Sequence, residues 1–177
     1  MIIKLIYLNR KIAFNIYAIY FRILTKNKNK IKMLGKVNIL NRNVIIGKNV
    51  IIYPGVSFEG NGKIIIGDNC KIGTNTIICA SKDGGVKIGN NTIVAATVYI
   101  IDANHGTHKD SLICNQKLES QIVEIGNDVW IGANSTIIKG SKIDDGAVIG
   151  GNSLVNSEIN DFGIAVGIPA KIIKYRK

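Results

Sequence analysis

The two histidines of the chain, His105 and His108, lie close together in one segment. Imidazole titrates near neutrality, so it can accept the proton of a hydroxyl group as that oxygen attacks a carbonyl carbon. Asp102 and Asn104 precede His105 closely enough to orient its ring. We therefore interpret His105 as a candidate general base with Asp102 and Asn104 as candidate supports. Solvated loop histidines are the alternative.

The sequence offers few other groups for catalysis. A three-histidine zinc site is excluded because the chain holds only two histidines, and its three cysteines show no C-x-x-C spacing. We therefore expect no bound metal, no disulfide framework and a reducing cytoplasm as the compartment. Cys70 and Cys79 lie in apolar stretches and are interpreted as small core residues. The absence of a Ser-His-Asp pattern favours a reaction without a covalent intermediate on the protein.

A six-residue repeat flanks the histidine segment on both sides. An aliphatic residue, often followed by glycine, returns every six residues, and a small or β-branched residue follows it four positions later. Six is a multiple of the strand period of two, so successive markers point to the same face of short strands. The aliphatic markers are Ile46, Ile52, Ile66, Ile72, Ile78, Ile88, Val94, Ile100, Ile125, Ile131, Ile137, Ile143, Ile149 and Val155.

These short strands predict a triangular coil with the aliphatic markers stacked inside it. Asparagine tolerates positive φ, which places Asn69, Asn75, Asn91, Asn134 and Asn152 at the corners. Three hexads make one coil, which gives roughly six coils in a solenoid-like stack. The 24 residues between Ile100 and Ile125 interrupt the repeat. We interpret this segment, 101–124, as a loop extruded from one corner, where rigid scaffolds often carry functional residues.

The pattern Ile-Gly-x-x-[Ser/Thr/Val]-x resembles that of the hexapeptide-repeat acyltransferases. The segment 125–159, IGNDVWIGANSTIIKGSKIDDGAVIGGNSLVNSEI, resembles their sugar O-acetyltransferase branch, which includes maltose, galactoside and polysaccharide acetyltransferases. The closing segment VGIPAKIIK, 166–174, resembles the end of the same branch. The resemblance covers residues 37–174. It implies an all-β, left-handed parallel β-helix that transfers acetyl from acetyl-CoA to a sugar hydroxyl.

The resemblance also implies roles for individual residues. In that branch a loop histidine shortly before the Trp-Ile-Gly segment is the catalytic base, which favours His105, whereas His108 is either a substrate contact or solvated. Trp130 is implied to border the acetyl pocket, with a subunit interface as the alternative. A homotrimer is implied because the donor groove lies between subunits. Coenzyme contacts are implied at Ala133, Gly150, Gly151, Ser157, Lys171 and Lys174.

The start of the chain departs from the repeat and is strongly basic. Residues 1–36 hold nine Lys or Arg and no acid, out of a net charge of +11. Residues 1–26 fit an amphipathic α-helix, because one narrow stripe holds Lys4, Lys11, Asn15, Arg22 and Lys26. The charge-free run 12–21 is too short to span a bilayer. The helix either lies in an anionic membrane surface or packs on the first coil or on an oligomer partner.

We therefore expect a basic helix and linker at 1–33, an acyltransferase β-helix at 34–174 with its active-site loop at 101–124, and a basic tail at 175–177. The predicted function is O-acetylation of a sugar or a cell-surface polysaccharide precursor. The alternatives are N-acetylation of an amino-sugar nucleotide or a small amine, and a non-catalytic structural β-helix. The expected place is the cytoplasm, with peripheral contact at the inner face of the membrane and no nucleic-acid partner.

Overall fold

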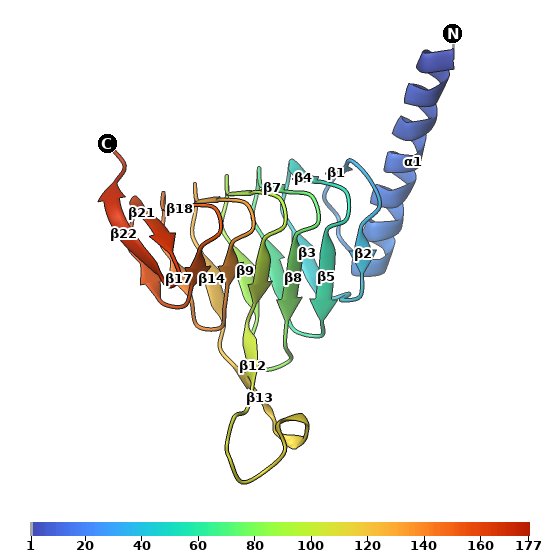
Figure 1. Ribbon diagram of the computed structural model, residues 1–177. Helices are drawn as coiled ribbons and strands as arrows, with labels where there is room; N and C mark the ends of the chain where they lie inside the picture. Colours follow the sequence, from blue (N-terminus) through green and yellow to red (C-terminus); the bar gives the residue numbers. More distant parts are fainter. Residues whose placement is uncertain (1) are drawn as a thin grey trace.

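The computed structural model describes residues 2–177, with side chains from residue 9 onward, so the Lys4 side chain lies outside the described part. Short parallel strands wind into a three-sided prism, with helix α1 (Ile2–Thr25) at one end and a projecting hairpin at mid-length (Figure 1). Three sheets form its sides and are called sheets A, B and C. This is the predicted left-handed parallel β-helix with an N-terminal helix.

Each sheet takes one strand from each coil. Sheet A contains β1 (Ile31–Met33), β4 (Val50–Ile52), β7 (Lys71–Ile72), β10 (Ile93–Val94), β15 (Trp130–Ile131), β18 (Val148–Ile149), β21 (Gly163–Gly167) and β22 (Ala170–Tyr175). Sheet B contains β2 (Asn38–Ile39), β5 (Ser57–Gly60), β8 (Ile77–Ala80), β11 (Tyr99–Ile101), β16 (Thr136–Ile137) and β19 (Leu154–Val155). Sheet C contains β3 (Val44–Ile46), β6 (Ile64–Ile66), β9 (Val86–Ile88), β14 (Val123–Ile125), β17 (Lys142–Ile143) and β20 (Glu158–Ile159).

The chain visits the sheets in the fixed order A, B, C, which closes six coils and begins a seventh with β21. The register places the predicted markers directly above one another, as in the series Ile72, Val94, Ile131 and Ile149 of sheet A. All fourteen predicted aliphatic markers are buried. The period-two argument therefore identified the inward face correctly, because alternate residues of a strand point to opposite sides.

The small residues four positions after the markers complete the core. Nine of these residues are buried, and several of the nine carry a hydroxyl group. The nine are Val50, Cys70, Thr76, Thr92, Val129, Ser135, Ser141, Ala147 and Ser153. Their hydroxyls donate to backbone carbonyls of the next coil, as Thr92 does to Gly126 O at 2.9 Å and Ser135 does to Gly150 O at 3.0 Å. A buried hydroxyl without such a partner would cost free energy. These bonds explain how serine and threonine fit among stacked isoleucines.

The corners have the backbone geometry that the sequence predicts. Asn69, Asn75, Asn91, Asn134 and Asn152 all adopt φ between 56° and 60°, in the left-handed region that asparagine tolerates. Side-chain amides also link successive corners, because Asn49 donates to Asn69 and Asn69 donates to Asn91, at 3.1 and 3.0 Å. The stack therefore fixes the position of each turn relative to its neighbours.

Helix α1 closes the N-terminal end of the prism. Phe21 is fully buried, and the centre of its ring lies 5.6 Å from that of Phe58 inside the first coils. Just after the helix, Asn27 donates to Val44 O and accepts from Ile46 N, both at 2.8 Å, so its amide covers the unpaired edge of β3. The packing interpretation therefore applies to the C-terminal half of α1, and β1 begins upstream of the boundary placed at residue 34.

The opposite end is closed by a hairpin. Strand β22 runs antiparallel to β21 and extends to Tyr175, into the segment expected to be a tail. Their connection contains Pro169, preceded by a cis peptide bond. Arg176 then pairs with Asp128 at 3.0 Å, which fastens the chain end to an earlier corner.

Candidate active site

The projecting segment is a two-stranded hairpin. Strands β12 (Ala103–His105) and β13 (Leu118–Ser120) pair antiparallel, with His105 opposite Leu118. They leave the prism between β11 of sheet B and β14 of sheet C, so the hairpin stands at the corner between these sheets (Figure 1). The short 3₁₀ helix η1 (Ile113–Asn115) lies in the loop beyond the two strands. The His105 side chain is therefore exposed on a strand that the prism supports.

The base of the hairpin is held by a buried carboxylate. Asp102 is fully buried, and its two carboxylate oxygens accept from Ser81 N at 2.8 and 3.0 Å. The Ser81 hydroxyl in turn donates to the Ser120 hydroxyl at 2.7 Å. Asp102 and Asn104 are the two predicted supports for the imidazole. The structure instead gives this carboxylate a partner on the preceding coil, and Asn104 is exposed opposite Glu119.

The tip of the hairpin is organised by Gln116. Its side-chain oxygen accepts from His108 N at 2.9 Å, and its amide nitrogen donates to His108 O at 2.8 Å and Ser111 O at 2.9 Å. Gly106 is buried beneath it, where an added Cβ would lie 2.7 Å from the Gln116 oxygen. Sequence reasoning missed Gln116, because an isolated glutamine in a loop carries no recognisable pattern. The His108 side chain is exposed at this tip.

An outer contact fixes the second strand of the hairpin. Glu119 pairs with Lys139 of the following coil at 2.7 Å, and the hydrogen bond from this lysine lowers the pKa of the Glu119 carboxyl. Gly140 N also donates to Gln121 O at 3.2 Å. The hairpin is thus attached to the coil before it through Ser81 and to the coil after it through Lys139 and Gly140. Such two-sided support restricts where His105 can lie.

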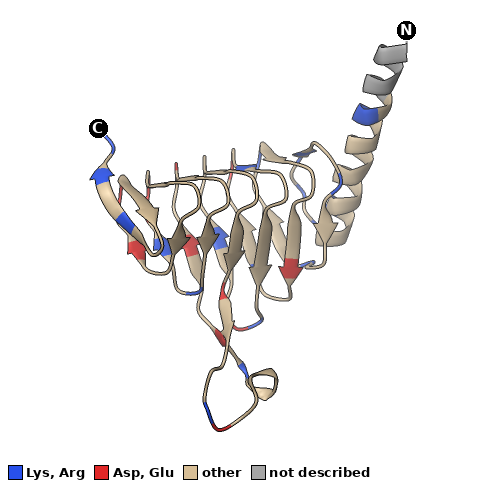
Figure 2. Ribbon diagram, in the orientation of Figure 1, with Lys and Arg blue, Asp and Glu red and all other residues tan. Residues whose placement is uncertain are grey.

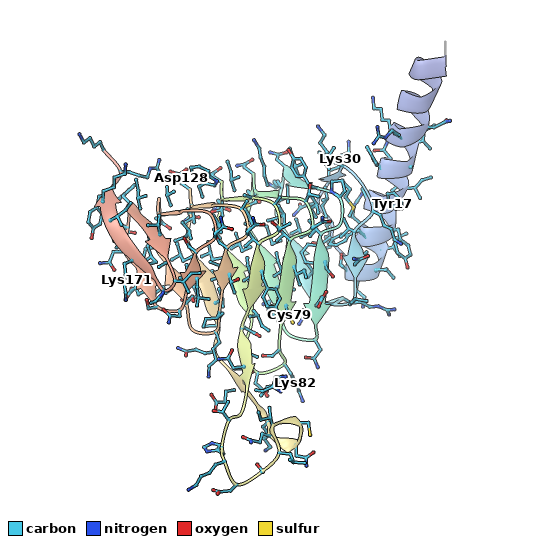
Figure 3. The ribbon with its side chains drawn as sticks, in the orientation of Figure 1. Tyr17, Lys30, Cys79, Lys82, Asp128 and Lys171 are labelled. Carbon is cyan, nitrogen blue, oxygen red and sulfur yellow. The ribbon has the colours of Figure 1, made fainter. Side chains whose placement is uncertain are left out.

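His105 borders a pocket of about 530 Å³ between the hairpin and sheet B. Its walls come from the turn after β5, the turn after β8 and the inner side of the hairpin. Figure 3 shows Cys79 and Lys82 at the base of the hairpin. The residues that line it are Gly60, Asn61, Cys79, Ala80, Ser81, Lys82, Asp83, Ile101, Asp102, Ala103, His105, Lys117, Leu118 and Ser120.

Cys79 belongs to this pocket, so its interpretation as a core residue was wrong. Its neighbour Ile78 points inward, and the alternation of a strand therefore turns Cys79 outward. Partial burial, together with the carboxylates of Glu59 and Asp102, raises the pKa of the Cys79 thiol. A thiol with a raised pKa is a weak nucleophile at neutral pH. Cys70 is buried in the core as expected.

Four of the implied coenzyme contacts lie together at the corner between sheets A and B. Ala133 and Gly151 follow β15 and β18 at successive coils, and Ala133 O accepts from Asn152 N at 2.9 Å. A Cβ on Gly151 would lie 3.1 Å from Ala133 O, whereas one on Gly150 would lie 2.6 Å from Val166. Val166 pairs with Lys171 across the final hairpin. Bare backbone and an exposed lysine thus meet at this corner.

The remaining implied contacts lie elsewhere. Ser157 stands between β19 and β20, at the corner between sheets B and C, which is also the corner of the hairpin. Lys174 is paired with Ile164, toward the other edge of sheet A. Sheet B therefore separates Ser157 from the corner that holds Ala133 and Gly151. The structure brings together Ala133, Gly150, Gly151 and Lys171, but not all six residues.

Trp130 also lies apart from the hairpin. It is 54% exposed on sheet A, between Ile93 and Val148, while the hairpin leaves the corner between sheets B and C. Within one chain, Trp130 and His105 consequently occupy different sides of the prism. Across residues 2–177, the described side chains form no group of three or more His, Cys, Asp or Glu that could hold a metal ion.

Two family models match the repeats on either side of the hairpin. "Bacterial transferase hexapeptide (six repeats)" matches residues 122–157, and "Hexapeptide repeat of succinyl-transferase" matches residues 63–101. The boundaries agree with the structure, because the gap between the two matches contains β12 and β13.

Two curated proteins are similar in sequence to this chain over part of their length. The chain is 37% identical over 123 residues to the putative lipopolysaccharide biosynthesis O-acetyl transferase WbbJ of Escherichia coli, which covers 65% of this chain and 62% of that protein. It is 34% identical over 123 residues to the galactoside O-acetyltransferase of Escherichia coli, covering 70% of this chain and 59% of that protein. The chain therefore spans less than two thirds of the length of these relatives.

Solved structures agree in fold. AntD, an N-acyltransferase from Bacillus cereus in complex with dTDP and 3-hydroxybutyryl-CoA, superposes with a TM-score of 0.76 at 23% identity, over 88% of this chain and 86% of that one. A maltose O-acetyltransferase from Clostridium difficile superposes with a TM-score of 0.59 at 22% identity, over 93% and 89%. Likeness at these identities concerns the fold. The inward hexad and the two matched segments show that residues 63–101 and 122–157 are hexapeptide repeats of the kind found in bacterial transferases.

Proposed function

We propose that this protein is an O-acetyltransferase that moves an acetyl group from acetyl-CoA to a hydroxyl of a sugar or of a cell-surface polysaccharide precursor. The observation that carries the proposal is His105, which borders a pocket on a hairpin held from two neighbouring coils. The names of the two relatives from Escherichia coli support O-acetylation. The N-acyltransferase AntD is similar in fold at 23% identity and does not favour N-acetylation for this chain.

In the proposed mechanism, His105 is the general base for the acceptor hydroxyl. Its imidazole takes the proton of the acceptor hydroxyl as that oxygen attacks the thioester carbonyl, and then returns the proton to the departing sulfur. Acetyl-CoA supplies the activated acetyl group when bound. Asp102 acts through position, since it fixes Ser81 and the start of β12. The Cys79 thiol, whose pKa is raised, shapes the pocket wall and takes no covalent part.

The corner between sheets A and B fits the donor. Ala133 and Gly151 are exposed and carry minimal side chains, so an extended pantetheine arm can approach the backbone there. The exposed Lys171 lies near this corner and suits a phosphate group. We retain Ser157 and Lys174 as further contacts, at the far edge of sheet B and along β22.

Replacing the imidazole tests the role of His105. His105→Ala should lower turnover of a sugar acceptor by about 10²–10⁴-fold, the usual contribution of a general base, while acetyl-CoA binding is unchanged. The matched control is Lys109→Ala, an exposed side chain at the tip of the same hairpin, which should keep full turnover. Near-wild-type turnover by His105→Ala would overturn the assignment. Mass spectrometry of the product would distinguish an ester from an amide.

We further propose that the enzyme is a homotrimer in which His105 of one subunit faces the donor corner and Trp130 of the next. The support is that one chain holds these groups on different sides of the prism. Mixing two inactive variants, His105→Ala and Ala133→Trp, tests this arrangement. Reassembled mixed trimers should regain about a quarter of wild-type turnover, because roughly one interface in four then combines two intact halves. Turnover that stays at zero after verified mixing would refute a shared site.

Finally, we propose that residues 1–26 bring the enzyme to the inner face of the cytoplasmic membrane, where a lipid-linked acceptor would be accessible. The support is the excess of basic residues in 1–36 and the amphipathic pattern of α1. Among the described residues, no helix is long and apolar enough to cross a bilayer. Contact with the membrane would therefore be made from one side.

A further inference from the structure

A groove of about 740 Å³ lies beside α1 and is separate from the His105 pocket. The helix forms one wall, and the outer surface of β1 and β4 forms the other, at the end of the prism where α1 packs (Figure 1). Five of its ten lining residues are apolar, and three are cationic. The lining residues are Asn15, Ala18, Ile19, Arg22, Lys30, Ile31, Lys32, Asn49, Val50 and Ile51.

The cationic side chains of the groove lack acidic partners. The first acid of the whole sequence is Glu59, so residues 1–58 supply none, and no lining residue is acidic. The Nε atom of Arg22 is buried and, within the described part of the chain, has no hydrogen-bond partner. Its Nη2 atom makes one long bond to Lys28 O at 3.3 Å. A guanidinium in this state is suited to an anionic oxygen, which it can bind in two-point geometry.

The side of α1 turned away from the prism is apolar. Ile12, Ile16, Ile19 and Ile23 follow the 4, 3, 4 spacing of one helical face, and they are 50%, 58%, 54% and 69% exposed. Figure 2 shows no acidic residue on the part of this helix that is not drawn in grey. Ile19 belongs both to this face and to the lining of the groove. A surface that immerses the isoleucine face therefore also meets the mouth of the groove.

We propose that this groove binds one anionic phospholipid of the membrane, with the phosphate among Arg22, Lys30 and Lys32 and an acyl chain over Ala18, Ile19 and Ile51. The inference rests on the proposed membrane contact of residues 1–26 and is independent of acetyl transfer. Basic side chains attract the anionic leaflet, while the isoleucine face enters the interface between headgroups and acyl chains. A bound lipid would fix the rotation of the helix about its axis, and with it the orientation of the prism.

The distribution of charge disfavours a second copy of this chain as the occupant of the groove. Pairing two α1 helices would bury the isoleucine faces, but it would also bring together two ends that hold eleven Lys or Arg each within residues 1–58 and no acid. Like charges at such an interface disfavour association. An anionic bilayer satisfies the apolar face and the cationic groove at once.

The test uses the full-length protein, because Phe21 is fully buried and deletion of α1 would expose the core. The probe is dihexanoyl-phosphatidylglycerol below its micelle concentration, titrated by calorimetry, followed by co-sedimentation with phosphatidylglycerol vesicles. The groove variant is Arg22→Gln/Lys32→Gln. The matched control, Lys26→Gln/Lys28→Gln, removes the same charge at the same end from exposed residues outside the groove lining. Lys30→Gln/Lys32→Gln, with both side chains exposed, replaces the groove variant if circular dichroism shows misfolding.

We expect the wild type to bind one short-chain lipid per chain, and the groove variant to bind it about thirtyfold more weakly, the effect of two basic residues at a lipid surface. The control should keep the short-chain binding. No saturable binding, or equal loss in both variants, would overturn the groove site. Equal competition by inorganic phosphate would overturn the lipid as its ligand. If the wild type also ignores vesicles, the membrane contact itself is wrong, whereas acetylation of a soluble acceptor tests the enzymatic proposal separately.

Discussion

Removal of the Phe21 ring should destabilise the whole β-helix, although this residue lies in the helix and outside the repeat. The ring is fully buried, and it meets Phe58 at 5.6 Å between ring centres with the planes tilted by 58°. Truncation of a buried Phe to Ala costs about 3–5 kcal/mol, of which the aromatic pair contributes about 0.5–1.5 kcal/mol. Domains of this size have total stabilities of roughly 5–15 kcal/mol, so the loss would be a large fraction.

Thermal unfolding followed by circular dichroism measures this effect. For a chain of this length each kcal/mol lowers Tm by about 2–4 °C, so Phe21→Ala should melt roughly 6–20 °C below the wild type. The matched control is Tyr20→Ala, its neighbour on the helix, which is 56% exposed and should lose much less. Equal melting temperatures for wild type and Phe21→Ala would refute the view that α1 closes the core. A large loss in Tyr20→Ala alone would place the opposite face of the helix against the prism.

Three further predictions concern the prism and the hairpin. Ile131→Asp puts a carboxylate inside the stack of sheet A, and the soluble folded fraction should fall sharply because the charge has no partner there. Asp102→Ala leaves Ser81 N without its acceptor, so it should cost about 1–3 kcal/mol in denaturant unfolding and lower turnover more than acetyl-CoA binding. Lys139 lowers the pKa of Glu119 in the folded protein below the pKa of glutamate in the unfolded chain. The ion pair therefore stabilises the hairpin fully above the unfolded pKa, and this stabilisation is lost as the pH falls through the folded pKa. The protection of the β13 amides, corrected for the pH dependence of intrinsic exchange, should therefore fall on acidification in the wild type, and much less so in Lys139→Met.

The fold could be predicted from the sequence because its main signals are local. Alternation along a strand determines that the side chains of Ile131 and Val94 point into the core. The left-handed φ of Asn69 depends on the side chain of that residue itself. The repeat also revealed its own interruption, which located the hairpin at 101–124 before any contact was known. The outward, half-buried position of Cys79 follows from the same alternation, since Ile78 is a marker.

The partners of Asp102 and Gln116 could not be predicted in the same way. Asp102 binds Ser81, one coil earlier, and this contact depends on which turn lies beneath the hairpin. Gln116 binds backbone atoms of His108 and Ser111 across the tip, and the path of that tip has no periodic signal. The burial of Phe21 likewise depends on how α1 meets the first coil. The contacts that the hairpin and helix α1 make with the coils depend on three-dimensional packing, which the six-residue repeat does not encode.

The arrangement of the candidate residues follows from the shape of a β-helix. Flat sheets stacked into a prism provide rigid positions but few concave surfaces, so the pocket at His105 exists only because the hairpin turns back beside sheet B. The donor corner at Ala133 and Gly151 lies across sheet B from that hairpin, and Trp130 stands on sheet A. In the proposed homotrimer a neighbouring prism would join these groups into one enclosed site, because its corner between sheets A and B would face the hairpin of the first copy.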